Sequence, residues 1–386
     1  MKVLFLAFGP PVVASSRTRV FQYLPFFQKE GIRYKVITNS TGLSYWPSAS
    51  SFNKTTQKIN GKSKLLGIAS YYLIKFFCSD ILVIRMAKAF AAKTVEILDA
   101  IFSFFQIGRF IFLAMFYDVL FIQKVLIPTF VFRLCSSIFK KKLVFDFDDA
   151  IYANPKIFDK KRLDRQLPLY NLLVIENEFT KEYARRYTDK DILAILGPID
   201  CNRYYPKNRI RRSEVVIGWV GSPSTQAYLD MLEDVFKRLY ETHTNLIFEF
   251  IGTRSMKFTR EPFRQKTWNL DTEVADLQNF DIGIMPLPDN EWTRGKGGYK
   301  LLQYMAVGIP CIASPVGVNM ELIREGENGF LAAVEDEWYE KISLLVREPE
   351  LRKKMGMRGR DFVVKNYSFE VAAPKLISAL WQLSCL

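Results

Sequence analysis

The stretch RGKGGYKLLQYMAVGIPCIASPVGVNMELI, residues 294–323, decides the fold of this chain. A strand-like run, DIGIMPL (281–287), precedes it, and a helical segment at 299–307 ends where Gly308 and Pro310 stop it. A second short strand, CIAS (311–314), leads through PVGVN to a helix that begins near Met320. Loops that leave parallel strands place helix N-termini around one crevice. The stretch therefore predicts two strand–loop–helix junctions that share an anion pocket.

The same alternation continues on both sides of this stretch. Strand-like runs occur at 3–8, 34–38, 81–85, 119–125 and 142–147, alternating with helical stretches such as 17–30 and 129–139. A second series at 215–221, 246–252, 281–287 and 311–314 follows the charged segment GPIDCNRYYPKNRIRRSE (197–214). This βαβ order predicts parallel sheets. We expect an α/β chain of two doubly wound domains, with a boundary near 196–213.

The composition is that of a globular chain long enough for two domains, with 386 residues of which 49% are hydrophobic and 24% charged. Five cysteines without a CxxC pair, and a single histidine, favour neither a disulfide framework nor a zinc site. The N-terminal run MKVLFLAFGPP indicates a first strand more than a signal peptide, because it breaks at Gly9. We expect a cytoplasmic chain.

The net charge of +14 is compatible with nucleic acid, a membrane surface or an anionic substrate as partner. Between Phe52 and Lys142 the only acids are Asp80, Glu96, Asp99 and Asp118, and the stretch is rich in phenylalanine. Basic and aromatic residues together indicate peripheral contact with an anionic membrane face. Charged residues interrupt the apolar runs too often for a spanning helix. The other interpretation, that the phenylalanines form core, stays open.

The glycines and cations that open the stretch are suited to phosphate. Gly295, Gly297 and Gly298 let the backbone approach a ligand closely, while Arg294, Lys296 and Lys300 supply charge. The alternative is an ordinary glycine-rich loop with solvated cations.

The segment RGKGGYKLLQYMAVGIPCIASPVGVNMELIREGENGFL resembles the donor-site segment of the family 4 glycosyltransferases. That family's usual form reads E, seven residues, E, then AMA, G, P and a GG turn. The turn from Gly9 to Arg19, the run FDFDDAIY, and VIENEFTKEYA with GPID extend the likeness over most of the chain. The resemblance implies the GT-B fold, in which two Rossmann-like domains face a cleft. We expect residues 1–200 to bind the acceptor and 201–368 the nucleotide-sugar donor, and 369–386 to form a helix that packs back on the first domain.

This chain departs from the family pattern at both glutamates. Alignment on QYMA places Gln303 at the Glu that binds the ribose, and Gly295 at the Glu near the sugar. Gln303 can still hydrogen-bond ribose hydroxyls. The family's Arg and Lys after the first strand of the second domain are replaced by GSPST, whose backbone and hydroxyls suit phosphate. The resemblance implies a donor site of Gly221, Ser222, Ser224, Thr225, Arg294, Lys296, Gly297, Gly298, Lys300, Gln303, Gly317 and Asn319. On the acceptor side we expect Gly9, Ser15, Ser16, Arg17 and Arg19.

The run VFDFDDA contains a DxD, Asp146 and Asp148, which in another glycosyltransferase fold would bind a metal. Because helix N-termini and cations already suit the diphosphate, we expect no metal and no other cofactor. By alignment Asp148 replaces a family His that faces the transferred sugar, and Asp149 follows it. We expect these two to be catalytic, and a pKa raised by burial would make one a base. The alternative is that the aspartates cap a helix or pair with Arg17 or Arg19.

The resemblance implies transfer of a sugar from a nucleotide donor to a glycan or lipid-linked acceptor, with retention of configuration, in building a surface polysaccharide or other glycoconjugate. A nucleotide-sugar epimerase of the same fold and a non-catalytic nucleotide-sugar-binding homologue remain alternatives. Prolines in place of the GxGxxG glycines after the first strand disfavour a dinucleotide-dependent oxidoreductase. Nucleic acid is disfavoured because the aromatics cluster with apolar residues instead of alternating with cations.

Overall fold

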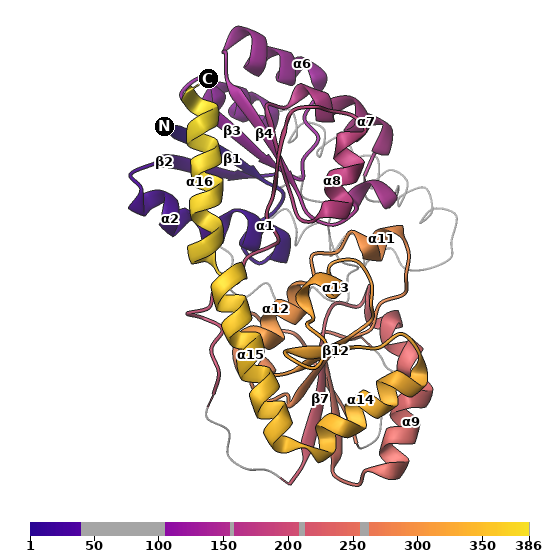
Figure 1. Ribbon diagram of the computed structural model, residues 1–386. Coiled ribbons are helices and arrows are strands. Elements are labelled where there is room, and N and C mark those ends of the chain that lie inside the picture. The colour runs from indigo at the N-terminus through magenta and orange to yellow at the C-terminus, as the bar shows by residue number, and fades with distance from the viewer. Residues whose placement is uncertain (40–104, 155–157, 208–212, 255–261, 386) are drawn as a thin grey trace, which may run out of the picture.

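The structure is a computed structural model that describes residues 1–39, 105–154, 158–207, 213–254 and 262–385. The strand-like run at 81–85, and the part of the basic, aromatic stretch that precedes residue 105, lie outside the described residues. Two six-stranded sheets form the described core, and their strand pairings are all parallel. Figure 1 shows the sheets one above the other, each flanked by helices.

The first sheet has the strand order β2-β1-β3-β4-β5-β6. Its strands are β1 (Lys2–Ala7), β2 (Arg33–Thr38), β3 (Val119–Gln123), β4 (Lys142–Phe147), β5 (Leu172–Ile175) and β6 (Asp191–Ala194). Along β1, Val3 and Phe5 join one apolar cluster while Leu4 and Leu6 join another, so both faces of the sheet are covered.

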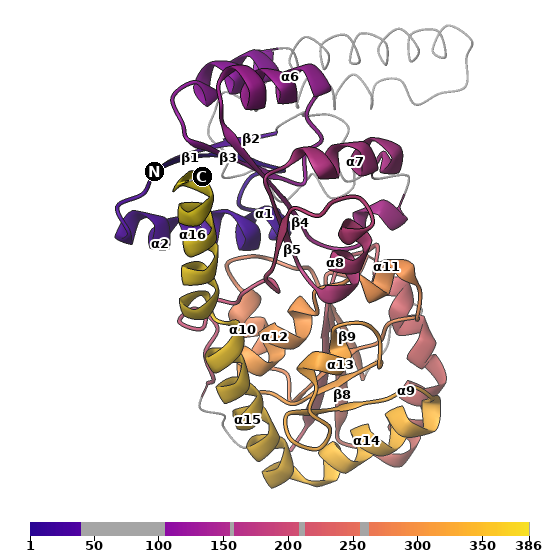
Figure 2. The same cartoon turned by 45° about the horizontal axis from the view of Figure 1, so that its top comes forward.

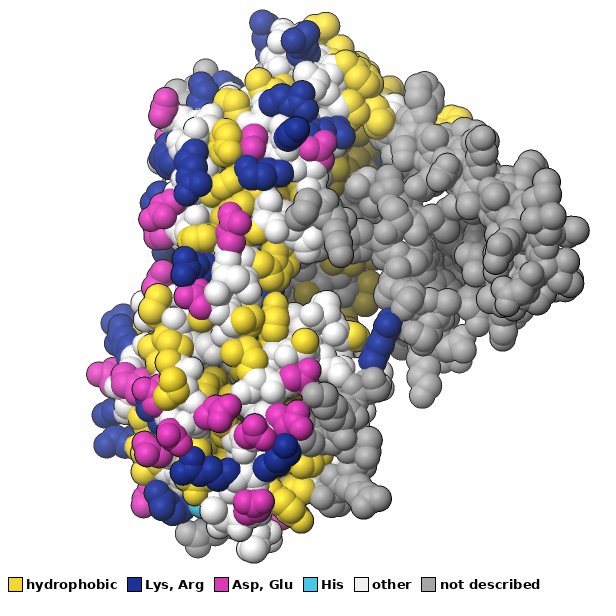
Figure 3. Space-filling model, turned by 90° about the vertical axis from the view of Figure 1, so that its right-hand side faces the viewer, with side chains coloured by type: hydrophobic (Ala, Val, Ile, Leu, Met, Phe, Trp, Pro, Cys, Tyr) yellow, Lys and Arg dark blue, Asp and Glu magenta, His cyan; other side chains and the backbone are white. Residues whose placement is uncertain are grey.

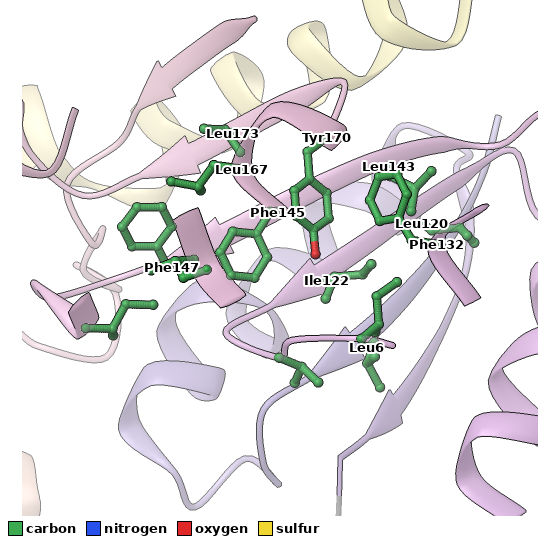
Figure 4. Packing of buried hydrophobic residues seen from close by; sticks show 14 of the residues in the cluster. Leu6, Leu120, Ile122, Phe132, Leu143, Phe145, Phe147, Leu167, Tyr170 and Leu173 are labelled. Atoms are coloured by element: carbon green, nitrogen blue, oxygen red, sulfur yellow. The ribbon is translucent and has the colours of Figure 1, made fainter. Parts of the chain in front are cut away.

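Helices cover both faces of this sheet. One face packs against residues 105–114, α6 (Thr129–Arg133), α7 (Lys160–Gln166) and α8 (Glu178–Arg185). Aromatic rings fill part of this layer: Phe145 of β4 stacks on Tyr170 with ring centroids 4.9 Å apart (Figure 4). The other face packs against α2 (Leu24–Lys29) and the C-terminal helix. The helix expected at 17–30 is broken: α1 (Ala14–Arg19) ends early and α2 starts anew, because Pro25 favours a first turn.

The second sheet has the order β12-β11-β10-β7-β8-β9. Its strands are β7 (Val215–Val220), β8 (Leu246–Ile251), β9 (Phe263–Lys266), β10 (Ile282–Met285), β11 (Cys311–Ala313) and β12 (Gly329–Leu331). One face packs against α12 (Tyr299–Ala306), and the other against α9 (Glu233–Thr242) and α14 (Glu335–Arg347). Three shorter helices lie in the connections: α10 (Glu273–Leu277), α11 (Glu291–Arg294) and α13 (Asn319–Leu322).

The chain ends in two helices that connect the sheets. α15 (Pro349–Tyr367) packs on α12, and α16 (Phe369–Cys385) crosses back to the first sheet, where Leu376 and Leu380 are buried against the cluster that contains Val3. Figures 1 and 2 both show α16 beside β1 and α2. The expectation that the last helix returns to the first domain is confirmed.

Candidate functional site

The carboxyl ends of strands from both sheets face each other where the two halves of the chain meet. Figure 1 shows α1 and α8 of the first half opposite α11 and α13 of the second. Direct contacts join the halves at residues 295–298, which we call the glycine loop. Asn177 Nδ2 donates to the carbonyl oxygens of Gly295 and Lys296, at 3.0 and 3.3 Å. The candidate site is therefore built by both halves.

Asp146, at the end of β4, forms a buried ion pair with Arg19. Arg19 Nε donates to both carboxylate oxygens at 3.2 and 3.0 Å, and a terminal nitrogen donates to Oδ2 at 2.6 Å. The other terminal nitrogen donates to the carbonyl of Ile195 at 2.6 Å. Burial raises the pKa of Asp146 to about 6, although the guanidinium acts in the opposite direction. Because Arg19 is 2% exposed and fully engaged, it cannot contact an acceptor in this arrangement. The alternative interpretation, pairing with Arg19, holds for Asp146.

Asp148 pairs with Lys124, which the sequence analysis did not single out. Lys124 Nζ lies 2.6 Å from Asp148 Oδ1, and the two side chains are 10% and 13% exposed. Lys124 has φ of 56°, a left-handed conformation that non-glycine residues rarely adopt. Burial by itself would raise the pKa of Asp148, but Lys124 and the Ser15 hydroxyl outweigh it, and the pKa is lowered. Asp148 therefore lacks the raised pKa that the role of a base would require, and this carboxylate is a weak base.

Asp149 is the more accessible of the two aspartates expected to be catalytic. Its side chain is 28% exposed, and its Oδ1 lies 3.9 Å from Lys296 Nζ. The backbone is left-handed, with φ of 54°. This conformation directs the N–H of Asp149 to Glu176 Oε2 at 3.3 Å. Asp149 is therefore the expected catalytic carboxylate that stands closest to the cations of the second half.

The three cations of the opening stretch have different surroundings. Arg294 ends α11, a helix that the sequence analysis did not predict and that begins with a capping box between Asn290 and Thr293. Arg294 pairs with Asp289 at 2.6 and 2.9 Å, and its side chain is 52% exposed. The structure therefore leaves it on the surface, while Lys296 faces Asp149 and stands 5.1 Å from the centre of the Trp292 ring.

Lys300 has no ion-pair partner among the described residues. Its Nζ lies 4.4 Å from the centre of the Trp219 ring, and no carboxylate among the described residues comes within ion-pair distance. Burial, followed by repulsion from Lys296, lowers the pKa of Lys300 to about 7. A partly buried ammonium without a counter-ion at the start of α12 is suited to an anionic ligand.

The glycine loop is closed by the first half of the chain. A methyl group added at Gly297 would lie 2.0 Å from the carboxyl carbon of Glu176, and one added at Gly295 would lie 2.4 Å from Cβ of Ala150. These two glycines therefore serve the approach of the two halves. Gly298, with φ of 64°, starts α12.

Gln303 belongs to a buried hydrogen-bond network. Its Nε2 donates to the Tyr204 hydroxyl at 3.2 Å, and that hydroxyl contacts the Glu273 carboxylate. Glu273 also accepts from Trp268 Nε1 at 2.9 Å and lies 4.0 Å from Arg17 of the first half. The expected ribose contact of Gln303 stays a prediction, and Arg17 faces the second half of the chain.

The remaining predicted donor residues lie in two turns. Ser222, Ser224 and Thr225 follow β7 and hydrogen-bond mainly to one another, with 2.8 Å between the two serine hydroxyls. Gly221 is packed on the Trp219 ring. In the other turn Gly317 is left-handed and touches the carbonyl of Arg294, while Asn319 Nδ2 donates to the Ser314 carbonyl at 3.0 Å and its Oδ1 is buried without a partner. The structure therefore places Gly317 next to the glycine loop.

The turn after β1 is held by side chains from within the first half. Gly9 N–H donates to Ser16 Oγ at 2.9 Å, and Ser16 donates to Gln123 Oε1 at 3.1 Å. Gln123 Nε2 donates to Ser15 Oγ at 2.8 Å. Ser16 is fully buried, so it fixes the turn, and Ser15 is the hydroxyl next to Asp148.

Within the described residues, His, Cys, Asp and Glu side chains form no group of three or more that could hold a metal ion. No helix among the described ranges is long and apolar enough to cross a bilayer.

Comparison with known proteins identifies this architecture. Residues 202–362 match the family model described as glycosyl transferases group 1. This part of the chain is therefore similar to the members of that family. The group 1 segment contains the glycine loop, both lysines and Gln303. Over 99 residues the chain is 36% identical to N-acetyl-alpha-D-glucosaminyl L-malate synthase of Bacillus anthracis, a match that covers 25% of each chain. The chain spans less than half the length of the curated relatives that it matches.

Two solved structures are similar over almost the whole chain. Sucrose-phosphate synthase from Thermosynechococcus elongatus has a TM-score of 0.63 at 12% identity, with 99% of this chain and 98% of that chain covered. HepE of Anabaena, in complex with UDP and glucose, has a TM-score of 0.61 at 15% identity, with 98% and 99% covered. These likenesses show the fold, which is GT-B, as expected.

Three residues of the site were not predicted from the sequence: Lys124, Glu176 and Glu273. Each is a buried or half-buried charged residue, and Lys124 and Glu176 directly follow a strand, β3 and β5. A charged residue directly after an apolar strand of a parallel sheet indicates a site residue, and this signal would have identified Lys124 and Glu176. Glu273 opens the short helix α10 and gave no such signal.

Proposed function

We propose that this protein is a glycosyltransferase that moves a sugar from a nucleotide-sugar donor to a glycan or lipid-linked acceptor. The observation that carries the proposal is Lys300, a partly buried cation that has no counter-ion in the described part of the chain and lies beside Lys296 at the start of α12 in the group 1 segment. A nucleotide diphosphate would supply the missing negative charge. HepE, which shares the fold, is in complex with UDP and glucose. UDP is therefore the first nucleotide to test.

In this proposal the donor lies against the second half of the chain and the acceptor against the first. Lys296 and Lys300 bind the phosphates, and the hydroxyls of Ser222, Ser224 and Thr225 can add hydrogen bonds. Asp149 contacts the transferred sugar or the acceptor hydroxyl. We further propose that configuration is retained, and that the product is a surface polysaccharide or other glycoconjugate, since the family resemblance implies both.

The test is a calorimetric titration with UDP and a product screen across UDP-sugars and GDP-sugars. Binding of a nucleotide diphosphate, together with transfer from one donor to an added acceptor, is the expected result. A donor converted to its epimer without transfer would instead support the epimerase alternative. Nucleotide binding without any turnover would support the non-catalytic one. Absence of binding to every nucleotide would refute the proposed phosphate site.

We also propose that turnover needs no divalent metal, because the two lysines and the α12 N-terminus suit the diphosphate. Transfer is expected to survive EDTA. Complete loss that Mn²⁺ or Mg²⁺ restores would contradict this and would make the DxD a metal site.

A cytoplasmic location at the inner face of an anionic membrane is a further part of the proposal. The surface formed by residues 105–116 and 129–141, which we call the apolar–basic surface, carries exposed hydrophobic side chains. They are Phe105, Phe112, Met115, Phe116, Phe130 and Ile138. Arg109, Arg133 and Lys140 are exposed in the same segments. Figure 3 shows Lys and Arg beside hydrophobic side chains over the upper, first half of the molecule. This combination supports docking on anionic lipid.

Vesicles of phosphatidylcholine with phosphatidylglycerol are expected to retain the protein at low salt and to release it as salt rises. The double variant Phe112→Ser with Phe116→Ser should bind less, while Tyr240→Ser, an exposed aromatic on α9, serves as the control. Equal retention by pure phosphatidylcholine would contradict the role of the basic residues.

A further inference from the structure

Glu176 contacts the glycine loop from the first half of the chain, and the proposed phosphate site does not account for this contact. Glu176, directly after β5, is 7% exposed and lies against the backbone of Gly297, where a methyl group would come within 2.0 Å of its carboxyl carbon and Oε1. A methyl group at Gly197 would lie 3.0 Å from the same Oε1. The carboxyl is thus enclosed by backbone on two sides.

The Glu176 carboxyl has few neighbouring groups that would stabilise a negative charge on it. Its Oε2 accepts from the N–H of Asp149 at 3.3 Å, which is long for such a bond. Among the described ion pairs none includes Glu176. An ionised carboxylate enclosed in this way would be unfavourable, whereas a neutral acid would not.

The charges around Glu176 act in both directions. Asp148 and Asp149, which follow β4, oppose its ionisation, and Arg19 of α1 favours it. Burial is the larger effect, and together these raise the pKa of Glu176 to about 8. Lys296 is the chain neighbour of Gly297, against which Glu176 lies. Four other ionisable side chains line a cavity of about 180 Å³ together with Glu176: Glu178, Glu321, Tyr367 and Lys375.

We propose that Glu176 is a positioning residue that, as a neutral acid, lets the first half of the chain close on the glycine loop. Its neighbour Asn177 completes the closed contact through the carbonyls of Gly295 and Lys296. Closure places Lys296 opposite Asp149. Ionisation of Glu176 favours the open arrangement, in which water reaches the carboxylate. The inference deepens the proposed function, because the glycine loop carries the proposed phosphate contacts.

The sign of the pH effect follows from linkage. In the open arrangement a hydrated Glu176 titrates near its usual pKa of 4.5, and in the closed one near 8. Between these two pH values only the closed form holds the proton. The equilibrium constant for closure, which we call the closing constant, therefore falls by up to about tenfold for each unit that the pH rises. Above pH 8 the carboxyl is ionised in both forms, and the closing constant no longer changes.

The first experiment compares Glu176→Gln with the wild type in UDP affinity from pH 5.5 to 9. Gln keeps a neutral side chain of the same shape, so the ratio of wild-type Kd to variant Kd is expected to rise with pH up to about 8 and then stay constant. Ionisation of UDP and of Lys300 affects both proteins alike and cancels in the ratio. Glu178→Gln, an exposed neighbour on α8, should follow the wild type. A ratio that does not change with pH would overturn the proposal.

The second experiment needs no nucleotide and therefore stands even if the phosphate site is wrong. Small-angle X-ray scattering should show the radius of gyration of the wild type rising between pH 6 and 8, while that of Glu176→Gln stays at the compact value. If both proteins expand alike, another group governs closure. If the wild type stays compact throughout, Glu176 does not control it. A merely structural role would lower the stability of the variant without removing the pH dependence.

Discussion

Replacing Lys300 with Met tests two properties of this buried cation: its effect on folding stability and its proposed contribution to UDP binding. Met keeps an unbranched apolar chain over the Trp219 ring but removes the ammonium, which is 4.4 Å from the ring centre. Without nucleotide the variant should be more stable, because burial lowers the pKa of Lys300 from 10.5 to about 7, and a charge that is disfavoured in the folded state is gone.

The size of both effects can be estimated. A shift of this size corresponds to at most about 5 kcal/mol, and a partly exposed side chain reduces it to about 1–3 kcal/mol, a rise of a few degrees in Tm. UDP affinity should fall by about 1.5–3 kcal/mol, or roughly 10- to 150-fold, as expected for the loss of a charge-assisted phosphate contact.

Differential scanning fluorimetry with and without UDP measures both effects at pH 7, and calorimetry gives Kd. As pH rises from 7 to 10.5, the unfolded chain keeps the Lys300 proton and the folded one does not, so wild-type stability should gain a component that the variant lacks. Lys353→Met, at an exposed site on α15, is the matched control. Unchanged UDP affinity would refute the phosphate role. A variant that is less stable without nucleotide would show that the ammonium is compensated after all.

Three further changes test other parts of the site. Asp149→Asn should lower turnover at least tenfold and leave UDP affinity nearly intact, because its carboxylate is proposed to act on sugar or acceptor; equal losses in both would assign it to the donor. Gln303→Glu should lower the free energy of unfolding by about 1–3 kcal/mol in urea titrations, because it brings a second carboxylate to the Tyr204 hydroxyl. Tighter UDP binding without this loss of stability would instead support the ribose role of residue 303. Gly283→Ala should cost about 1–3 kcal/mol, since its methyl group would lie 2.4 Å from the Tyr304 ring; an unchanged urea midpoint would mean that the ring moves freely.

Much of the sheet architecture is readable from the sequence, and the reasons are local. Runs such as KLVFDF and VVIGWV are buried on both faces, so they appear as continuous apolar segments between helices, and β4 and β7 have nearly the predicted bounds. The strands β5, β6, β9 and β12 were missed. All four strands are only three or four residues long. In addition, β6 and β9 are largely exposed, so the sequences of these two carry little apolar signal.

The candidate site was less predictable because its properties come from contacts between distant segments. The sequence places glycines and lysines at 294–300, but it does not show that Ala150 and Glu176 fill the space beside two of those glycines. The lowered pKa of Asp148 likewise depends, against burial, on Lys124, 24 residues away in the chain. Residue types and strand ends are local information, whereas pairing and burial are not.

The return of α16 to the first sheet has a consequence for biosynthesis. Val3, Phe5, Val144 and Val174 form a face of that sheet which α16 covers, yet α16 is translated only after every strand of the second sheet. While the ribosome makes residues 215–367, this apolar face has no cover from α16. The second domain can therefore complete its core before the first, which reverses the usual order of N-terminal folding during synthesis. Until α16 leaves the exit tunnel, the part of this face that α16 covers in the folded protein remains accessible to chaperones.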